Sequence, residues 1–360
     1  MKHIRTTLLA LACLFAISLA TAQEGSTVVD GLNGPMGLAM DDDGNLWVVE
    51  SGTGGDETIE MRDEASGETT VLSLGTTSRI LRVSPDGETT EIAHLPSLAT
   101  PMGVEGGARL AFLDGALYAT SGFWIETAGP EPMPLMASIV RIDDASVTSV
   151  ADTWAFEDAE NPDGFIRESH PYGLAVGPDG WVWVADAGAN SLLRVNPADG
   201  TIELVAVFEG IEGPMPNPNR GGAMESDPVP TGIAVDADGT IYVALLPGFP
   251  FVPGSGKIVA VSPDGVVTDH ALGLTMVTDI AFGPDGALYA VQLGQFTQEG
   301  PMPNSGALLR IADGGSSEVL SALSFPTALA FNPEGDVFLT MNGAGGPGGA
   351  VVRYDGVASR

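Results

Sequence analysis

Oxygen-bearing side chains recur at equivalent places in a repeated two-strand phrase of this sequence. When the repeats are aligned on their turn glycines, Glu50, Asp186 and Gln292 end the second strand of their repeats. Asp279 stands on an inner strand near the same end. Carboxylate and amide oxygens are ligands that Ca²⁺ prefers, although Ca²⁺ takes six or more and only four are present. The four residues are candidate metal ligands, and the alternative is that they cap strand ends by accepting backbone N–H groups.

His170 is the candidate catalytic residue. It begins the inner strand of the third repeat, and Asp186 ends the neighbouring antiparallel strand, so the two are expected to approach each other. An aspartate that fixes the imidazole tautomer makes histidine a general base. The sequence contains no Gly-x-Ser-x-Gly motif to supply a serine nucleophile. The alternative role for His170 is that of a hydrogen-bonded loop residue.

Aromatic side chains lie on or near the segments that connect the predicted strands. Trp124, Tyr172, Phe249 and Phe251 can stack on a sugar or an aromatic metabolite when acids lie beside them. Covering the hydrophobic ends of the strands is the alternative role. With Asn190, these four residues join the acidic and amide residues and His170 as predicted ligand-binding residues.

The elements that position these side chains are repeats of one phrase, two short β-type runs joined by a tight turn. Asp-Gly between two such runs favours a hairpin, because glycine takes the positive φ that the turn needs. The six turn glycines are Gly44, Gly115, Gly180, Gly239, Gly286 and Gly335. A third and a fourth β-type run follow most copies, and the fourth run of the second copy is Val147–Phe156. Four antiparallel strands repeated radially form a propeller blade. The sequence therefore predicts an all-β, six-bladed β-propeller of four-stranded antiparallel blades.

The sixth repeat lacks its fourth strand because the chain ends soon after the third run, Ala350–Tyr354. The segment Ser26–Leu32 resembles the other fourth strands. We therefore predict that the N-terminal strand closes the ring, which also covers the unpaired sheet edges.

The long connections fall between second and third strands and between blades, and these two kinds lie on one face of an up-down-up-down blade. Long loops gathered on one face of a rigid scaffold are usually the functional surface. Among them, Gly213–Gly222 contains three prolines, resembles Gly300–Asn304 and is predicted to lack regular structure.

The N-terminal segment predicts export. Lys2 and Arg5 precede an apolar run from Leu8 to Leu19, and small residues follow, so residues 1–22 are interpreted as a signal peptide and 23–360 as the propeller. We expect a secreted or periplasmic monomer without a membrane span. Cys13 is the only cysteine, so the mature chain has no disulfide. The formal net charge of −33 disfavours nucleic acid and anionic membranes as partners.

Several motifs resemble the ScyD/ScyE family of exported propeller proteins. They include Asn161-Pro-Asp-Gly164, His170-Pro-Tyr-Gly173 and Gly248-Phe-Pro-Phe-Val-Pro253, and the similarity covers the chain from about residue 30 onward. Val184–Val195 also resembles an NHL repeat, and the architecture is similar to gluconolactonase-type propellers. The family resemblance implies the fold and export. In the gluconolactonase-type propellers a similar acidic and amide set binds the metal.

Three functions are consistent with this pattern. The main prediction is a binding module for a small molecule, glycan or protein at the long-loop face. The alternative is a Ca²⁺-dependent enzyme of the lactonase or lyase type, with its site at the channel mouth. A purely structural extracellular scaffold is the third possibility.

Overall fold

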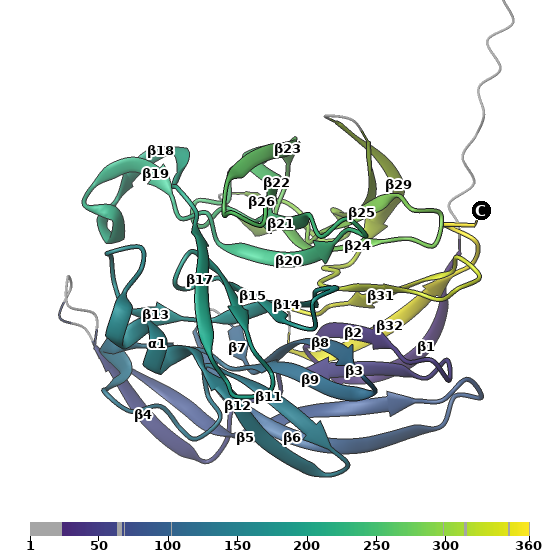
Figure 1. Cartoon of the computed structure of the whole chain (residues 1–360), viewed down its shortest axis with the longest axis horizontal. Coiled ribbons are helices and arrows are strands. Elements are labelled where there is room, and N and C mark those ends of the chain that lie inside the picture. The colour runs from purple at the N-terminus through teal and green to yellow at the C-terminus, as the bar shows by residue number, and fades with distance from the viewer. Residues whose placement is uncertain are drawn as a thin grey trace, which may run out of the picture.

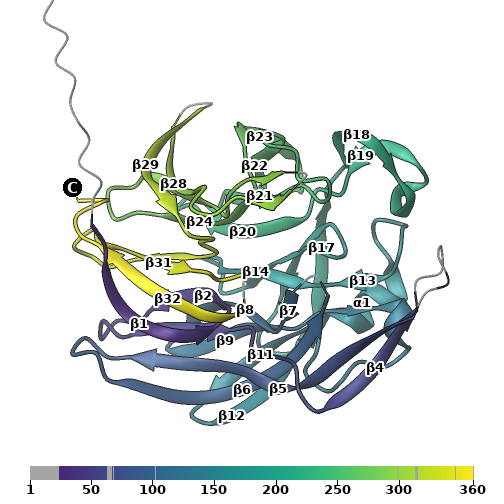
Figure 2. The ribbon, with the colours of Figure 1, turned by 180° about the vertical axis from the view of Figure 1, so that it is seen from behind.

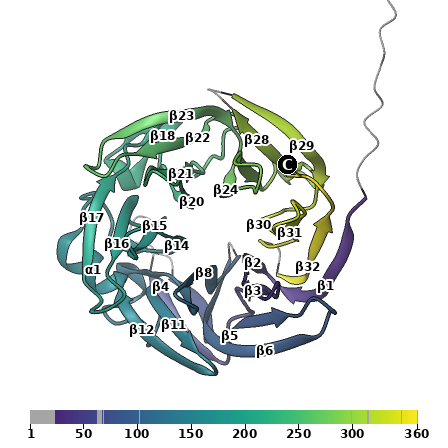
Figure 3. The same ribbon diagram turned by 45° about the vertical axis from the view of Figure 1, so that its right-hand side comes forward.

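The computed structural model describes residues 24–62, 67, 69–101, 103–297, 299–312, 315–344 and 346–359. The predicted signal peptide lies outside these ranges. The described chain is almost entirely β, and its sheets are arranged as blades in a ring (Figure 1, Figure 3). None of its helices is long and apolar enough to cross a membrane.

The first three blades follow each other along the chain. Blade 1 contains β2 (Pro35–Met40), β3 (Leu46–Glu50), β5 (Thr69–Val83) and β6 (Thr89–Thr100), with β4 (Glu57–Arg62) and β7 (Gly103–Glu105) paired at its edges. Blade 2 contains β8 (Gly107–Leu113), β9 (Ala116–Ser121), β11 (Ser138–Asp143) and β12 (Ser146–Asp152). Blade 3 contains β14 (Pro171–Val176), β15 (Val182–Asp186), β16 (Ser191–Val195) and β17 (Ile202–Val207).

The last three blades complete the ring. Blade 4 contains β20 (Pro230–Val235), β21 (Ile241–Leu245), β22 (Gly256–Val261) and β23 (Val267–Leu274). Blade 5 contains β24 (Val277–Phe282), β25 (Leu288–Gln292), β28 (Gly306–Ala312) and β29 (Gly315–Leu323). Blade 6 contains β30 (Leu329–Phe331), β31 (Val337–Met341), β32 (Pro347–Tyr354) and β1 (Ser26–Asn33).

Short elements fill the connections. Three two-stranded sheets pair β10 (Trp124–Ile125) with β13 (Glu168–Ser169), β18 (Ile211–Asn217) with β19 (Ala223–Ser226), and β26 (Phe296–Thr297) with β27 (Gly300–Pro301). The helical segments are α1 (Thr153–Glu160), η1 (Glu126–Ala128) and η2 (Pro218–Arg220).

The predicted six-bladed fold and its closure by the N-terminal strand are confirmed. β1 pairs antiparallel with β32, with Ser26 opposite Arg353 and Leu32 opposite Gly349 (Figure 2). Leu32 is 2% exposed and packs in a core cluster that includes Leu38 of blade 1. The chain therefore closes its ring with hydrogen bonds and apolar burial together.

The hairpin turns are formed as the repeats predicted. At Gly180, φ is 76°, and its N–H donates to the carbonyl oxygen of Gly177 at 3.0 Å. A residue with a Cβ is strained in this left-handed conformation, which explains the glycine. The hydrophobic core lies mainly between consecutive blades, where alternating strand residues of one sheet pack on those of the next.

Two sequence predictions about local structure were wrong. Val147–Phe156 was expected to be one outer strand, but β12 ends at Asp152, whose side chain accepts the Ala155 N–H and caps α1. Gly213–Gly222 was expected to lack regular structure, yet it contributes to β18 and η2. The paired positions of β18 skip from Glu212 to Asn217, so the intervening prolines need not donate to the ladder.

Candidate functional site

Three of the predicted metal ligands cap strand ends instead. The side chains of Glu50, Asp186 and Gln292 each accept a backbone N–H from a residue just before the first strand of the same blade. The donors are the amides of Asn33 at 2.6 Å, His170 at 2.6 Å and Thr275 at 2.7 Å, respectively. These contacts fit the alternative from the sequence, in which the three side chains cap strand ends by accepting backbone N–H groups.

The four candidates do not assemble the predicted metal site. Glu50 forms a 2.6 Å ion pair with Arg79, and Asp279 pairs with Arg109 at 3.3 Å. In the described part of the chain, no group of three or more His, Cys, Asp or Glu side chains is placed to hold a metal ion. The arrangement does not match the six or more oxygens that Ca²⁺ takes.

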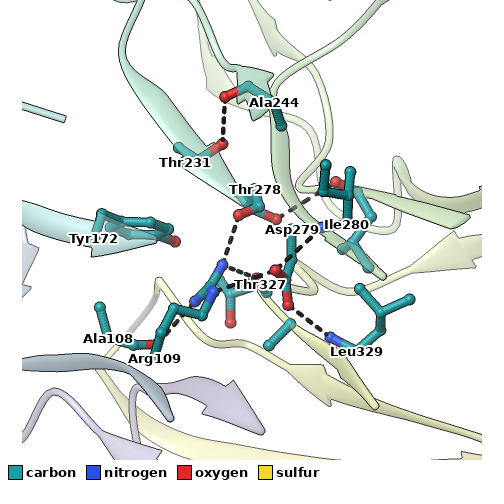
Figure 4. A network of polar contacts seen from close by, with 12 residues as sticks. Ala108, Arg109, Tyr172, Thr231, Ala244, Thr278, Asp279, Ile280, Thr327 and Leu329 are labelled. Carbon is teal, nitrogen blue, oxygen red and sulfur yellow. Dashed lines mark hydrogen bonds and ion pairs between the residues drawn. The ribbon is translucent and has the colours of Figure 1, made fainter. Parts of the chain in front are cut away.

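Arg109 and Asp279 meet at the centre of the ring from the inner strands of blades 2 and 5 (Figure 4). The Arg109 guanidinium donates to backbone carbonyls of Met36, Thr278 and Thr327, which belong to or adjoin blades 1, 5 and 6. Its Cζ also lies 4.5 Å from the centroid of the Tyr172 ring of blade 3. One side chain thus ties together the inner strands of most of the propeller.

The sequence alone marked Asp279 but not Arg109, because the blade 2 turn is one residue shorter and only the strand pairing places Arg109 at the position equivalent to Asp279. They stand where blades 1, 3 and 4 have Gly37, Gly173 and Gly232, and a Cβ added at Gly173 would lie 1.9 Å from the Thr231 carbonyl oxygen. Opposite charges therefore replace glycine in two blades that face each other across the ring. Burial raises the pKa of Asp279, and the Arg109 charge opposes that rise.

His170 is not paired with Asp186 through its imidazole, which corrects the predicted catalytic pair. Asp186 accepts the backbone N–H of His170 and the Ser169 hydroxyl at 2.7 Å. The imidazole Nε2 lies 3.4 Å from the Glu105 carboxylate, and the ring contacts Tyr172 edge-to-face. The partner of His170 is therefore Glu105, which lies far from it in sequence.

A pocket of about 140 Å³ lies where His170 meets the connections of blades 3 and 4. Asp163 comes from the loop after α1, Glu168 from β13, Asn190 from the β15–β16 turn, and Asp227 from the segment before β20. These connections belong to the long-loop face. Sequence reasoning placed His170 and Asn190 among the ligand-binding residues but missed the three acids, although the quoted Asn161-Pro-Asp-Gly164 motif contained Asp163.

Among the residues that line the pocket, Glu168 has a strongly raised pKa. Burial, followed by the negative charges of Asp186, Asp227, Glu105 and Asp163, raises its pKa to about 8. Its Cγ packs on Gly188, where an added Cβ would come within 2.7 Å. A carboxyl group with this pKa is mostly protonated at pH 7 and is able to donate a proton.

Asn190 is a buried residue with an unsatisfied acceptor. Its φ of 51° is left-handed, a conformation that asparagine tolerates, and 4% of the residue is exposed. The Nδ2 group donates to Asp163 Oδ2 at 2.9 Å and to the Gly188 carbonyl oxygen at 3.4 Å. Its Oδ1 has no hydrogen-bond partner among the described residues.

The predicted aromatic residues do not share this pocket. Trp124 is 2% exposed, donates to the Gly129 carbonyl oxygen and belongs to a core cluster, so its predicted role at a binding surface is wrong. Tyr172 is buried against Arg109. Phe249 is 69% exposed and contacts Phe251.

Comparison with known proteins places the chain among β-propellers. No family model matches the sequence. Gluconolactonase from Zymomonas mobilis is 29% identical over 130 residues, which are 34% of this chain and 33% of that protein. The chain thus aligns with about a third of the length of this curated relative.

Two solved structures have similar folds at low sequence identity. A structural genomics protein from Bacteroides thetaiotaomicron has a TM-score of 0.56 and 13% identity, covering 93% of this chain and 76% of the other. A gluconolactonase from Xanthomonas campestris has a TM-score of 0.50 and 15% identity, covering 93% and 99%. These similarities support the β-propeller class, and the activities belong to those proteins.

Proposed function

We propose that this chain is an enzyme of the lactonase or lyase type that works by acid–base catalysis in the pocket of Glu168 and His170. One observation carries the proposal: a carboxyl group whose pKa is raised to about 8 lines the same pocket as an imidazole. The partial sequence similarity to a gluconolactonase favours this function over the binding module. No step of the proposal depends on a metal ion.

The two groups supply complementary steps. For a lactone, the His170 imidazole accepts a proton from water as the water oxygen bonds to the carbonyl carbon. Glu105, 3.4 Å from Nε2, stabilises the imidazolium that forms. The ring C–O bond breaks, and Glu168 donates its proton to the departing oxygen. Solvent then returns a proton to Glu168 and removes one from His170. For a lyase, the same imidazole would take a proton from the carbon next to a carbonyl group. A double bond would form to the adjacent carbon as its C–O bond breaks, and Glu168 would protonate the departing oxygen.

Hydrolysis of δ-gluconolactone and of uncharged aliphatic lactones tests the proposal, with acid release followed in weak buffer. Glu168→Gln should lower kcat by about 10²–10⁴, the usual contribution of a positioned acid or base. Glu318→Gln makes the same substitution at an exposed residue of β29 and should leave kcat unchanged. Equal turnover by wild type and Glu168→Gln, or no turnover of any lactone or lyase substrate, would remove support for the enzyme.

The exposed aromatic residues support a second candidate function, binding of a glycan at the long-loop face. Phe249 is 69% exposed, its ring lies 6.0 Å from that of Phe251, and Phe251 lies 5.2 Å from Phe296. Such rings stack on sugar faces. Retention on immobilised polysaccharide that is lost in Phe249→Ala would support it, and equal elution with or without polysaccharide would contradict it.

A further inference from the structure

An arginine and an aromatic residue face each other across the same two strands in five of the six blades. The arginine is on the third strand of the blade, directly opposite the aromatic residue of the second strand. The pairs are Arg82 with Trp47, Arg141 with Tyr118, Arg194 with Trp183, Arg310 with Tyr289, and Arg353 with Phe338. The repeat therefore places equivalent guanidinium groups in five blades, and their surroundings can be compared directly.

Four of these five arginines are neutralised by a carboxylate of their own blade. The ion pairs are Arg141 with Asp143 at 2.8 Å, Arg194 with Glu203 at 2.7 Å, Arg310 with Asp285 at 3.2 Å, and Arg353 with Asp336 at 2.6 Å. Arg82 of blade 1 differs, because within the described part of the chain no carboxylate lies at ion-pair distance from it. Its Cζ lies 5.9 Å from the centroid of the Trp47 ring.

The contact with Trp47 does not take the place of an ion pair. In blade 3, the Cζ of Arg194 lies 4.6 Å from the centroid of the Trp181 ring, and Arg194 still pairs with Glu203. A cation over a ring face keeps its N–H donors for other acceptors. In a sequence with a formal net charge of −33, Arg82 is thus a guanidinium that the described residues leave able to bind an anion.

Arg82 lines a pocket of about 470 Å³ between blades 1 and 2. The Trp47 and Phe112 rings meet edge-to-face in its wall, with centroids 5.7 Å apart. The Trp47 indole N–H already donates to Asp41 at 2.8 Å, so the ring and not its N–H is left for a ligand. The other apolar lining residues are the half-buried Ile92 and the buried Leu117 and Ile142.

Two acidic residues also line the pocket, and neither neutralises Arg82. The Oε2 of Glu91 accepts from Arg79 at 3.2 Å, and its Oε1 lies 2.8 Å from Nε2 of His94, so both oxygens have partners. Asp144 is exposed in the turn between β11 and β12, where solvent and salt screen its charge. The half-buried Arg82 is the charge that lies beside the aromatic wall.

We propose that this pocket binds a planar aromatic carboxylate, with its ring against Trp47 and Phe112 and its carboxylate on the Arg82 guanidinium. A guanidinium presents paired N–H donors that match the two oxygens of a carboxylate. The edges and faces of aromatic side chains favour a third ring beside them. Gly115 and Ala145 of the short turns also line the pocket, so it lies on the face opposite the long loops. The inference is therefore independent of the proposed function.

Three probes built on one naphthalene ring separate charge from apolar contact. At pH 7.5, 2-naphthoate is negative, 2-naphthamide is neutral and 2-naphthylmethylamine is positive, and isothermal titration calorimetry measures their affinities. We expect 2-naphthoate to bind about tenfold more tightly than 2-naphthamide, because a hydrogen bond to a charged group is worth more than one to a neutral group. The amine should bind no more tightly than the amide. Equal affinities, tighter binding of the amine, or no binding of 2-naphthoate would each overturn the inference.

Acetate tests whether the aromatic wall takes part in binding. It carries the same carboxylate without a ring and should bind about tenfold more weakly than 2-naphthoate, because it buries no ring against Trp47 and Phe112. Equal affinity for acetate and 2-naphthoate would contradict the aromatic class of ligand.

Variants at Arg82 and Thr90 locate the carboxylate. Arg82→Gln should weaken 2-naphthoate binding by about tenfold and leave 2-naphthamide binding unchanged. Thr90 lies opposite Arg82 on β6, the place that Glu203 occupies in blade 3. Thr90→Glu should therefore supply an internal carboxylate and weaken 2-naphthoate binding by a similar factor, whereas Thr90→Gln should not. Arg310→Gln, at the equivalent position of blade 5, is the matched control and should change nothing. Unchanged 2-naphthoate binding in folded Arg82→Gln and Thr90→Glu would overturn the assignment.

Discussion

The centre of the ring and the pocket between blades 3 and 4 both contain buried charge, but they satisfy it differently. At the centre, Asp279 faces Arg109, whose guanidinium also reaches three backbone carbonyls. In the pocket, Glu168 is surrounded by other acids, and Asn190 Oδ1 lacks a donor. Removing one partner of a buried ion pair is costly because it leaves the other charge unpaired, and a buried carboxyl group among like charges is costly unless it holds a proton. The difference separates a structural pair from a candidate site.

The largest effect should come from removing the arginine at the centre. Arg109→Met leaves Asp279 without its cation and three carbonyls without their donor, and should cost about 3–5 kcal/mol of unfolding free energy. Urea denaturation at pH 7 measures this. The double variant Arg109→Met with Asp279→Leu should regain much of the loss, because no buried charge then remains unpaired. A loss below about 1 kcal/mol in Arg109→Met would mean that the pair does not stabilise the ring.

Glu168→Gln should have a smaller and opposite effect in the pocket. Burial raises the pKa of Glu168 in the fold from its ordinary 4.5 to about 8, so the folded state holds the proton more tightly than the unfolded state. The stability from this group is fully present below pH 4.5 and is lost as pH rises through 8. Above pH 8, Glu168→Gln should therefore be more stable than wild type, by about 1–2 kcal/mol after allowance for solvent screening.

Urea denaturation of wild type and Glu168→Gln at pH 5 and pH 8.5 measures this difference. Glu318→Gln is the matched control and should show no such pH dependence. If the difference between Glu168→Gln and wild type were the same at both pH values, the raised pKa of Glu168 would be contradicted.

Asp186→Asn should have the smallest effect on stability and links the strand-end caps to the pocket. Loss of the charged acceptor for the His170 amide should cost about 1 kcal/mol, with or without Ca²⁺. The same change removes a negative neighbour of Glu168, so the pKa of Glu168 should fall. NMR titration of the Glu168 carboxyl carbon in both proteins measures the shift, and an unchanged pKa would show that Asp186 does not act on the pocket.

The fold was predictable because its determinants are local and repeated. Each turn glycine stands between two runs with strand periodicity, and the residues from Ser26 to Leu32 repeat the pattern of a fourth strand. The end of a strand depends on signals that do not repeat from blade to blade. The predicted fourth strand Val147–Phe156 is therefore longer than β12, which ends at Asp152. Its end is set by the Asp152 cap, which competes with the strand for the backbone.

The candidate site was predictable only in part. His170 and Asn190 stand beside recognisable strand ends, so their place on the long-loop face followed from the repeat. Asp163 and Asp227 come from separate connections, and no spacing in the sequence indicates that both lie in one pocket. Trp124 shows the converse, because a loop position near the functional face is buried by packing from other segments.

By itself, the sequence determined the strands, their turns, the number of blades and the strand that closes the ring. These depend on hydrogen-bonding period and backbone conformation, which neighbouring residues set. Only the tertiary structure decided that Glu50 and Asp186 are caps, that Arg109 neutralises Asp279, and that Glu168 is mostly protonated at neutral pH. Those properties arise from desolvation and from charges brought together across distant segments, and both exist only once the ring is formed.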